Sequence, residues 1–210
     1  MNSFLWSLRR KRKWRRLYGG DRVPTWLEEG PRREVVAARE EGWLPANASV
    51  IDLGCGLGYT SQWLADLGHE VLGVDRSKNA LKRARARCNA PSLTFRRANL
   101  ARPLRRAKTY DVVLDLLFLH QLPAGEHQAY AENVRRVSAP GTRLLFVERL
   151  THPRTGEKFT EEERAASIAE LLGPAFELEL VQRAEMQASR VTDKVWGGVE
   201  VRFRRVEVPD

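Results

Sequence analysis

The chain has 210 residues, 42% of them hydrophobic and 30% charged, and its 36 Lys and Arg against 27 Asp and Glu give a net charge of +9. This composition predicts one folded globular domain and excludes the disordered and fibrous classes. The best candidate for a membrane helix, residues 112–119, contains Asp115 and is far shorter than the roughly 20 residues required. Two cysteines are too few for a disulfide framework, and the first basic cluster follows apolar residues, the reverse of a secretory signal. We therefore expect a cytoplasmic protein.

The positive charge lies in two blocks. Residues 1–16 carry seven basic and no acidic side chains, residues 76–108 carry twelve and again none, and the rest of the chain has a net charge of −10. Such blocks attract nucleic acid, anionic lipid or an acidic partner, or they form a solvated basic face. In a helix over residues 4–18 the basic side chains would point in all directions, which disfavours a membrane-surface helix.

Strand and helix patterns alternate along the chain after an N-terminal segment. Residues 1–46 hold four of the six tryptophans and are expected to form a helical cap on a core of residues 47–208, within a single domain. In chain order, the expected strands are residues 49–53, 70–74, 93–95, 111–117, 142–148, 176–181 and 198–206. The expected helices are residues 59–67, 79–88, 125–137 and 161–172.

This alternation predicts an α/β fold. Strands that alternate with helices form a doubly wound, Rossmann-like and mostly parallel sheet with right-handed crossovers, here of seven strands. No helix separates the last two expected strands, so we expect them to form an antiparallel pair at the C-terminal edge of the sheet.

The strongest chemical signal is the run Asp52-x-Gly54-x-Gly56-x-Gly58 between the first strand and the first helix of the core. Glycines permit positive φ angles and let a ligand approach the backbone. A dinucleotide fingerprint would have its third glycine at position 59, where this chain has Tyr59. The loop therefore suits a cationic ligand with an amino-acid end better than a pyrophosphate.

A second signal is Asp75, which follows the second strand 19 residues after Gly56. A carboxylate at the end of this strand can accept two hydrogen bonds from a ribose diol. At this spacing the two signals together predict a cofactor that contains a nucleoside.

These motifs, with Tyr110-Asp111-Val112-Val113 in a later strand, resemble the class I S-adenosylmethionine-dependent methyltransferases over residues 45–150. The resemblance implies S-adenosylmethionine as cofactor and S-adenosylhomocysteine as product, with Asp75 at the ribose. Asn99 stands where the family usually has Asp beside the adenine. The expected cofactor-binding residues are Trp14, Trp26, Asp52, Gly54, Cys55, Gly56, Gly58, Asp75, Arg76, Asn99, Leu100 and Asp115.

Within that class the chain resembles the thiopurine and thiol S-methyltransferases. The aromatic N-terminal part of the likeness is carried by Trp14, Tyr18, Gly20, Pro24 and Trp26. Its middle part is carried by residues 111–115, Leu122-Pro123 and Tyr130-Ala131, and its last part by Arg190 and residues 193–197. One departure is Leu116, where parts of that family have an Arg that steers an anionic substrate; Arg190 or Lys194 is expected to replace it.

The residues at the end of the fourth expected strand limit which methyl acceptors are expected. Amino-group methylation of nucleic-acid bases is disfavoured because the fourth strand ends in Asp115-Leu116-Leu117-Phe118 without a proline, and no residue spacing predicts a metal site. We expect a small-molecule acceptor, with a thiol sulfur first, and a monomer or weak dimer. Two alternatives stay open: an O-methyltransferase with His120 as base, and an RNA-binding methyltransferase that uses the basic blocks.

Three side chains of the expected site allow more than one interpretation. His120 is either a base near the transferred methyl group or a packed histidine. Trp14 and Trp26 either wall the cofactor or pack a helix on the sheet, and Cys55 is expected to fill space, since nothing near it marks an activated thiolate. With Arg190, which is expected to steer an anionic substrate, His120 makes up the set of candidate catalytic residues.

Overall fold

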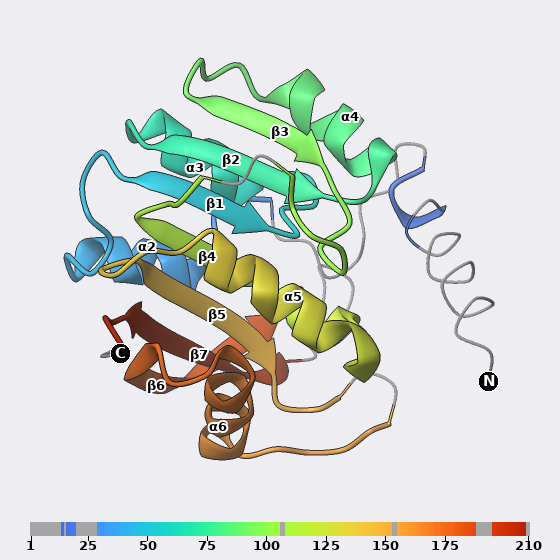
Figure 1. The fold of residues 1–210 in the computed structure, drawn as a ribbon. Coiled ribbons are helices and arrows are strands. Elements are labelled where there is room, and N and C mark those ends of the chain that lie inside the picture. Colours follow the sequence, from blue (N-terminus) through green and yellow to red (C-terminus); the bar gives the residue numbers. More distant parts are fainter. Residues whose placement is uncertain are drawn as a thin grey trace.

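The computed structural model describes residues 14, 16–19, 29–105, 108–152, 155–187 and 195–208 (Figure 1). Within these residues, one seven-stranded sheet has the order β3-β2-β1-β4-β5-β7-β6. The strands are β1 (Ser49–Leu53), β2 (Glu70–Asp75), β3 (Leu93–Arg97), β4 (Val112–Leu116), β5 (Arg143–Arg149), β6 (Phe176–Gln187) and β7 (Val195–Arg205). The helices are α2 (Arg33–Glu40), α3 (Tyr59–Asp66), α4 (Lys78–Arg87), α5 (Ala124–Arg136) and α6 (Glu161–Leu172), with a 3-10 turn η1 (Leu119–Gln121).

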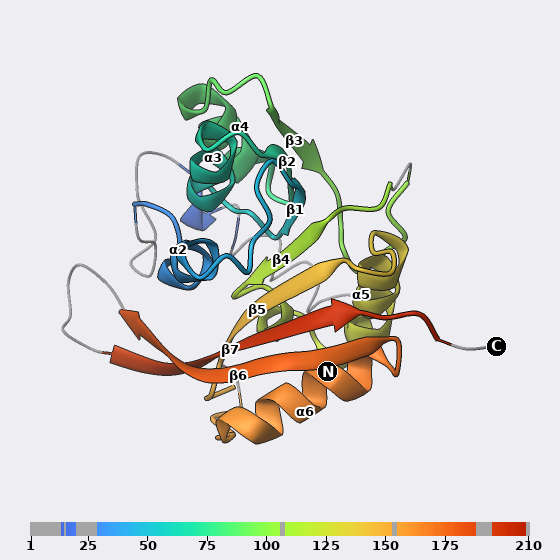
Figure 2. The same ribbon diagram turned by 90° about the vertical axis from the view of Figure 1, so that its left-hand side faces the viewer.

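The topology confirms the predicted α/β class. Strands β1 to β5 run parallel, and β7 is antiparallel to both β5 and β6. The last two strands form the expected antiparallel pair, with β7 lying inside and β6 at the edge of the sheet (Figure 2).

Strand β6 is longer than its sequence predicts. Polar residues after Val181 were not expected to be part of a strand, yet the ladder continues to the pair Gln187 and Val195. The second half of an edge strand is open to water on one side, so a mixed polarity is compatible with pairing there. The partner strand, and not the local pattern, therefore decides where β6 ends.

Helices cover both faces of the sheet. Figure 2 shows α2, α3 and α4 on one face and α5 and α6 on the other. Alternate side chains of β5 point to opposite faces of the sheet. Val147 belongs to the hydrophobic cluster that includes Val35 of α2, whereas Phe146 belongs to the hydrophobic cluster that includes Ile168 of α6. None of the described helices is both long and apolar enough to cross a membrane.

Local capping explains where two of the helices begin. The Thr160 hydroxyl accepts a hydrogen bond from the Glu163 amide, and the Glu163 carboxylate accepts one from the Thr160 amide. This reciprocal capping box starts α6 at the predicted residue. The Ser77 hydroxyl accepts from the Ala80 amide and starts α4 directly after β2.

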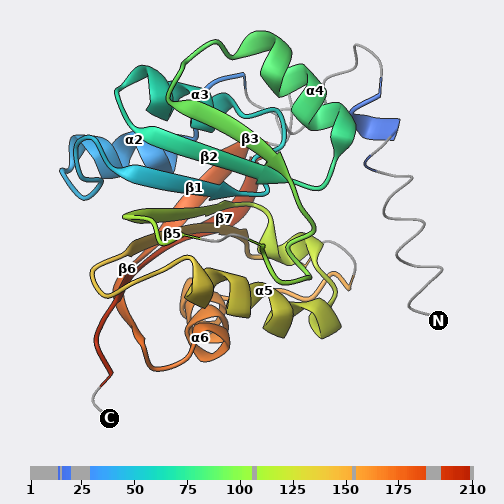
Figure 3. The same ribbon diagram turned by 45° about the horizontal axis from the view of Figure 1, so that its top comes forward.

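The carboxyl ends of the parallel strands meet at one edge of the sheet. Figures 1 and 3 show the described residues 14 and 16–19 at this edge, beside the start of α4. Tyr18 packs there in a small cluster with Leu57 of the glycine loop and Ala80 of α4. The described part of the expected cap therefore lies against the loop that carries the strongest sequence signal.

Candidate functional site

The glycine loop leaves β1 and turns sharply into α3. Gly54, Gly56 and Gly58 have φ angles of +87°, +55° and +69°, a region that other residues enter only with strain. The Gly54 amide donates to the Val74 carbonyl at 2.7 Å, which ties the loop to the end of β2. A Cβ on Gly54 would lie 2.6 Å from Cγ of Phe118, so the missing side chain leaves room for this ring.

Asp75 links the loop to the start of α4. Its carboxylate accepts from the Gly56 amide at 3.1 Å and from the Ser77 amide at 2.6 Å. Burial raises the pKa of Asp75, and these two hydrogen bonds oppose the rise. A carboxylate has about four acceptor sites, so two donors leave capacity for a diol. Asp75 thus fits the ribose role expected of it.

Asp52 lies beneath the loop with its side chain toward α3. It is 3% exposed and accepts a hydrogen bond from the Ser61 hydroxyl at 2.5 Å. Burial raises the pKa of Asp52 to about 6, although the bond from Ser61 lowers it and the nearby Asp75 raises it further. A cation at this end of the loop would favour the ionised carboxylate.

Tyr18 and Trp14 cover the loop from the N-terminal side. Their rings stack with centroids 5.8 Å apart, and the Tyr18 hydroxyl lies 3.1 Å from where a Cβ of Gly56 would be. Tyr18 is 8% exposed, and burial together with the Asp75 charge raises its pKa. Trp14 packs on Tyr18, and its expected contact with the cofactor stays a prediction. Trp26 and Arg190 lie outside the described residues.

Cys55 fills space within the loop, as its position among glycines suggested. Its sulfur lies 3.0 Å from where a Cβ of Gly73 would be. Burial raises the pKa of the Cys55 thiol, and the charges of Asp52 and Asp75 raise it further. A thiol held neutral in this way is not an activated nucleophile.

The residues expected at the adenine side follow β2 and β3. Arg76 is half-buried and its carbonyl accepts from Nε of Arg97 at 3.2 Å. Leu100 is 2% exposed, and its carbonyl accepts from the Asn133 amide at 2.9 Å. The half-buried Asn99 accepts a hydrogen bond from the amide of Ala101, so its carbonyl oxygen is partly engaged within the chain.

Asp115 shapes the turn that follows β4. Its buried carboxylate accepts from the Tyr130 hydroxyl at 2.5 Å and from the amides of Phe118 and Leu119 at 2.8 and 3.2 Å. Leu117 has a φ of +69°, an uncommon conformation for leucine that costs of order 1–3 kcal/mol. Asp115 therefore holds Phe118 over the glycine loop, and its expected contact with the cofactor stays a prediction.

A buried group of charges lies under the neighbouring strand end. His120 Nδ1 is 3.1 Å from Glu148 Oε2, which also accepts from Arg164 Nη2 at 2.7 Å. Because a carboxylate only accepts, we assign the proton to Nδ1, which leaves Nε2 to accept from the Gln121 amide 2.5 Å away. His120 is 3% exposed and Glu148 is fully buried.

Glu148 keeps its charge in this environment. Burial raises its pKa, but the contacts with His120 and Arg164 outweigh burial, so the net pKa is lowered. The charge of Glu148 and burial raise the pKa of the nearby Asp115 well above its usual value. The sequence analysis did not identify Glu148 or Arg164 as site residues. The available signal was the position of Arg164 on the same side of α6 as the apolar residues Ala165 and Ile168, which are buried.

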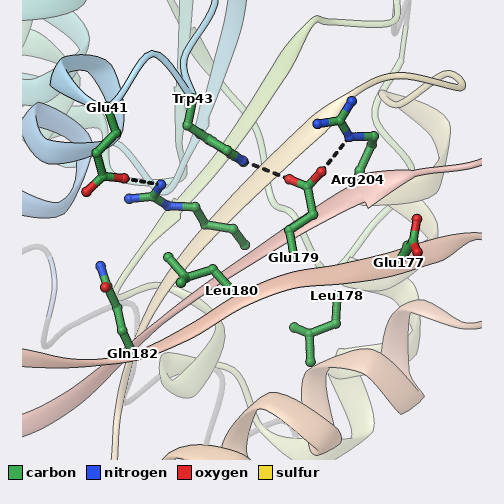
Figure 4. A pocket seen from close by; sticks show the side chains of 9 residues that line it. Glu41, Trp43, Glu177, Leu178, Glu179, Leu180, Gln182 and Arg204 are labelled. Carbon is green, nitrogen blue, oxygen red and sulfur yellow. Dashed lines mark hydrogen bonds and ion pairs between the residues drawn. The ribbon is translucent and has the colours of Figure 1, made fainter.

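A hollow of about 680 Å³ lies away from the glycine loop (Figure 4). It is lined by residues that follow α2 and by β6 and β7, near the ends of β6 and β7 opposite to the glycine loop. Glu179 accepts from Trp43 Nε1 at 2.8 Å and from Arg204 Nε at 2.5 Å. The charges of the side chains that line the hollow largely compensate one another, and none of the predicted site residues lines it.

No group of three or more His, Cys, Asp or Glu side chains in the described part of the chain could hold a metal ion.

Comparison with known proteins supports the methyltransferase resemblance. Residues 50–141 match the family model described as a methyltransferase domain. A solved SAM-dependent methyltransferase from Anabaena variabilis superimposes with a TM-score of 0.75 at 17% identity over 93% of each chain, which shows a common fold.

Two curated relatives each match half of the chain or somewhat more. The 2-heptyl-1-hydroxyquinolin-4(1H)-one methyltransferase of Mycobacteroides abscessus is 26% identical over 127 residues, 59% of this chain and 55% of the relative. The ubiquinone biosynthesis O-methyltransferase of Paraburkholderia xenovorans is 32% identical over 112 residues, 50% of this chain and 47% of the relative. The chain thus spans about half the length of these relatives.

Proposed function

Because the chain carries a class I S-adenosylmethionine-dependent methyltransferase domain, we propose that it methylates a hydroxyl oxygen of a small-molecule acceptor. The observation that carries this proposal is the pair of His120 and Glu148, an imidazole with an oriented carboxylate at the carboxyl end of the sheet. A hydroxyl has a high pKa and needs such a base. The names of the two curated relatives, one for a 1-hydroxy compound and one for an O-methyltransferase, agree with this acceptor.

The residues of the glycine loop fit the cofactor. S-adenosylmethionine supplies a methyl group on a sulfonium, which is a good leaving group. Glycines at three left-handed positions give the loop its sharp turn at the end of β1, where the methionine end would bind. Asp75 would accept from the ribose hydroxyls, and the ionised form of Asp52 would balance the positive charge of the amino-acid end. Cofactor affinity is then expected to fall as the pH drops below about 6, where Asp52 becomes protonated.

His120 would act through its second ring nitrogen. With its proton on Nδ1 and directed at Glu148, the ring presents an unprotonated Nε2. The acceptor hydroxyl would replace the Gln121 amide at this nitrogen. The hydroxyl proton would move to Nε2 and the oxygen would bond to the methyl carbon while the bond between that carbon and the cofactor sulfur breaks. S-adenosylhomocysteine would leave, and Glu148 would stabilise the resulting imidazolium.

A thiol sulfur, the first expectation from the sequence, is the second candidate acceptor. The strand end next to the site is apolar, since Leu116 and Leu117 are half-buried side chains of the core cluster there. A thiol with a pKa near 8.5 is partly ionised at neutral pH and needs no base. The two acceptors therefore differ in their dependence on His120.

One experiment separates the two acceptors. S-adenosylhomocysteine release is measured with a phenol and with the thiophenol of the same ring, for the wild type and for His120→Ala. We expect the variant to lose about 10²–10⁴-fold in kcat/KM with the phenol and little with the thiophenol. His127→Ala, which removes a half-buried imidazole bound to the Leu122 carbonyl, is the control. An unchanged rate with the phenol would refute the role of His120.

The cofactor is tested separately from the acceptor. Asp75→Ala removes the expected ribose contact and is expected to weaken S-adenosylmethionine binding in calorimetry. If the affinity is unchanged, the assignment of the cofactor site is wrong. The alternative of an RNA acceptor predicts tight RNA binding with a steep dependence on salt, which the same protein can be tested for.

A further inference from the structure

Arg149, the last residue of β5, lacks the acidic partner that two other buried arginines of the described chain have. Arg164 pairs with Glu148 at 2.7 Å, and Arg202 pairs with Glu200 and Glu41 at 2.6 Å each. Arg149 is half-buried, yet no described carboxylate contacts it, and its buried Nε has no hydrogen-bond acceptor. A guanidinium with this much lost hydration is expected to have an anionic partner.

The surroundings of Arg149 are apolar and aromatic. Its guanidinium carbon lies 3.9 Å from the centroid of the Trp196 ring at the start of β7. Burial is the cause that lowers the pKa of Arg149, with no acid to offset it. The carboxylate of Glu200, on the same face of the sheet, is already bound to Arg202 and Gln182. The ring supports the cation from one side but supplies no negative charge.

The register of the sheet places this cation near the expected acceptor. Asp52 is level with Leu114, and Leu114 is level with Leu145, so Arg149 lies four residues beyond the level of Asp52 and two strands away. That separation is about 13 Å along the strands and about 10 Å across them. Arg149 thus lies beyond the end of the loop expected to hold the methionine part of the cofactor, at the carboxyl edge where ligands bind in such sheets.

Glu148, the residue before Arg149, points to the opposite face of the sheet. Successive side chains of a strand alternate, so Glu148 points toward α6 and His120 while Arg149 points toward the face of α2. The end of β5 therefore presents the oriented imidazole of the proposed base on one face and an unpaired cation on the other. Leu116, the last residue of β4, pairs with Val147, two residues before Arg149 on the same strand.

The structure assigns Arg149, stacked on Trp196, as the binding site for an oxyanion, a carboxylate or phenolate, on an aromatic methyl acceptor. A planar guanidinium donates hydrogen bonds to such a group, two in parallel where it is a carboxylate, and the adjacent indole of Trp196 suits an aromatic ring. This assignment rests on the proposed function for the identity of the acceptor. The methionine carboxylate of the cofactor has the same chemistry, and the test distinguishes the two sources.

The test is a calorimetric titration with S-adenosylhomocysteine present. The probes are 4-hydroxybenzoate and 4-hydroxybenzamide, which share a ring and differ in charge. We expect the wild type to bind the acid at least about tenfold more tightly than the amide, the effect of one charge-assisted hydrogen bond. Arg149→Met is expected to abolish this preference and Arg149→Lys to keep part of it, with thermal unfolding as the check that each variant is folded.

Arg183→Met is the matched control. Arg183 is an exposed arginine of β6 that pairs with Glu161, and its loss is expected to leave the preference unchanged. Equal binding of acid and amide by the wild type, or a preference that survives in Arg149→Met, would overturn the assignment. So would a loss of S-adenosylhomocysteine affinity in Arg149→Met with the preference intact, because the anion would then be that of the cofactor. Preferential binding of the acid without turnover of any acceptor would instead contradict the proposed function and leave the anion site standing.

Discussion

Replacing Gly54 by alanine tests how the glycine loop and the turn after β4 are built together. Two separate costs are expected. The φ angle of +87° places an alanine in a region that costs roughly 1–2 kcal/mol. The new Cβ would also lie 2.6 Å from Cγ of Phe118, and overpacking of this kind costs about 1–3 kcal/mol. The total loss is therefore about 2–5 kcal/mol of unfolding free energy.

Gly141 provides the control for the backbone part of this cost. Its φ angle is +90°, it lies in a turn closed by a hydrogen bond from the Thr142 amide to the Ala139 carbonyl, and a Cβ there would meet nothing within 4 Å. Gly141→Ala is therefore expected to lose only the roughly 1–2 kcal/mol that the backbone conformation costs. The difference between the two variants measures the contact with Phe118.

The assay is urea denaturation of both variants and of the double variant Gly54→Ala with Phe118→Ala. Removing the ring removes the clash, so the two substitutions are expected to be non-additive by about 1–3 kcal/mol. Melting temperatures follow at roughly 2–4 °C per kcal/mol for a domain of this size. If Gly54→Ala loses no more stability than Gly141→Ala, or if the double variant is additive, Phe118 does not constrain the loop.

Three further substitutions, at two buried charged residues and one helix cap, are expected to change the unfolding free energy. Asp52→Asn keeps an acceptor for the Ser61 hydroxyl but cannot ionise. Because the pKa of Asp52 in the folded protein is about 6 and the usual value is 3.8, protonated Asp52 contributes stability below pH 4, and the wild type loses this stability as the pH rises through 6. In urea denaturation, the unfolding free energy of the variant relative to the wild type should therefore be up to about 3 kcal/mol more favourable at pH 8 than at pH 4. Parallel pH profiles would contradict this. Arg164→Met leaves Glu148 with one partner and should cost about 3–5 kcal/mol; a loss below 1 kcal/mol would show that His120 suffices. Thr160→Ala removes the cap of α6 and should cost about 1 kcal/mol in the same assay, whereas Thr160→Ser should cost little.

Local pattern was sufficient for most of the fold. The bounds of β1 and α6 agree with the sequence prediction because a short apolar run before glycines and a capping box are signals contained in a few adjacent residues. The loop at Gly54 and the position of Asp75 at the end of β2 follow from the same local rules. The helix α2 was expected only as part of a cap, since its polar residues give a weak apolar stripe.

Sequence reasoning was weaker for the interior of the site. Glu148 and Arg164 are charged residues that a single chain offers no reason to bury, and they become a pair only because β5 and α6 pack against each other. Phe118 reaches Gly54 across 64 positions of the chain through a strained turn at Leu117. Contacts of this kind depend on packing between distant segments, which residue periodicity does not encode.

The sequence by itself determined the succession of strands and helices, the glycine loop and the acid at the end of β2, because periodicity and turn chemistry act over a few residues. Only the tertiary structure decided that β7 lies between β5 and β6, that β6 continues past Val181, and that Arg149 stacks on Trp196 without an acid. These features arise from hydrogen bonding and burial between segments far apart in the chain, where the free energy belongs to the pair and not to either segment alone.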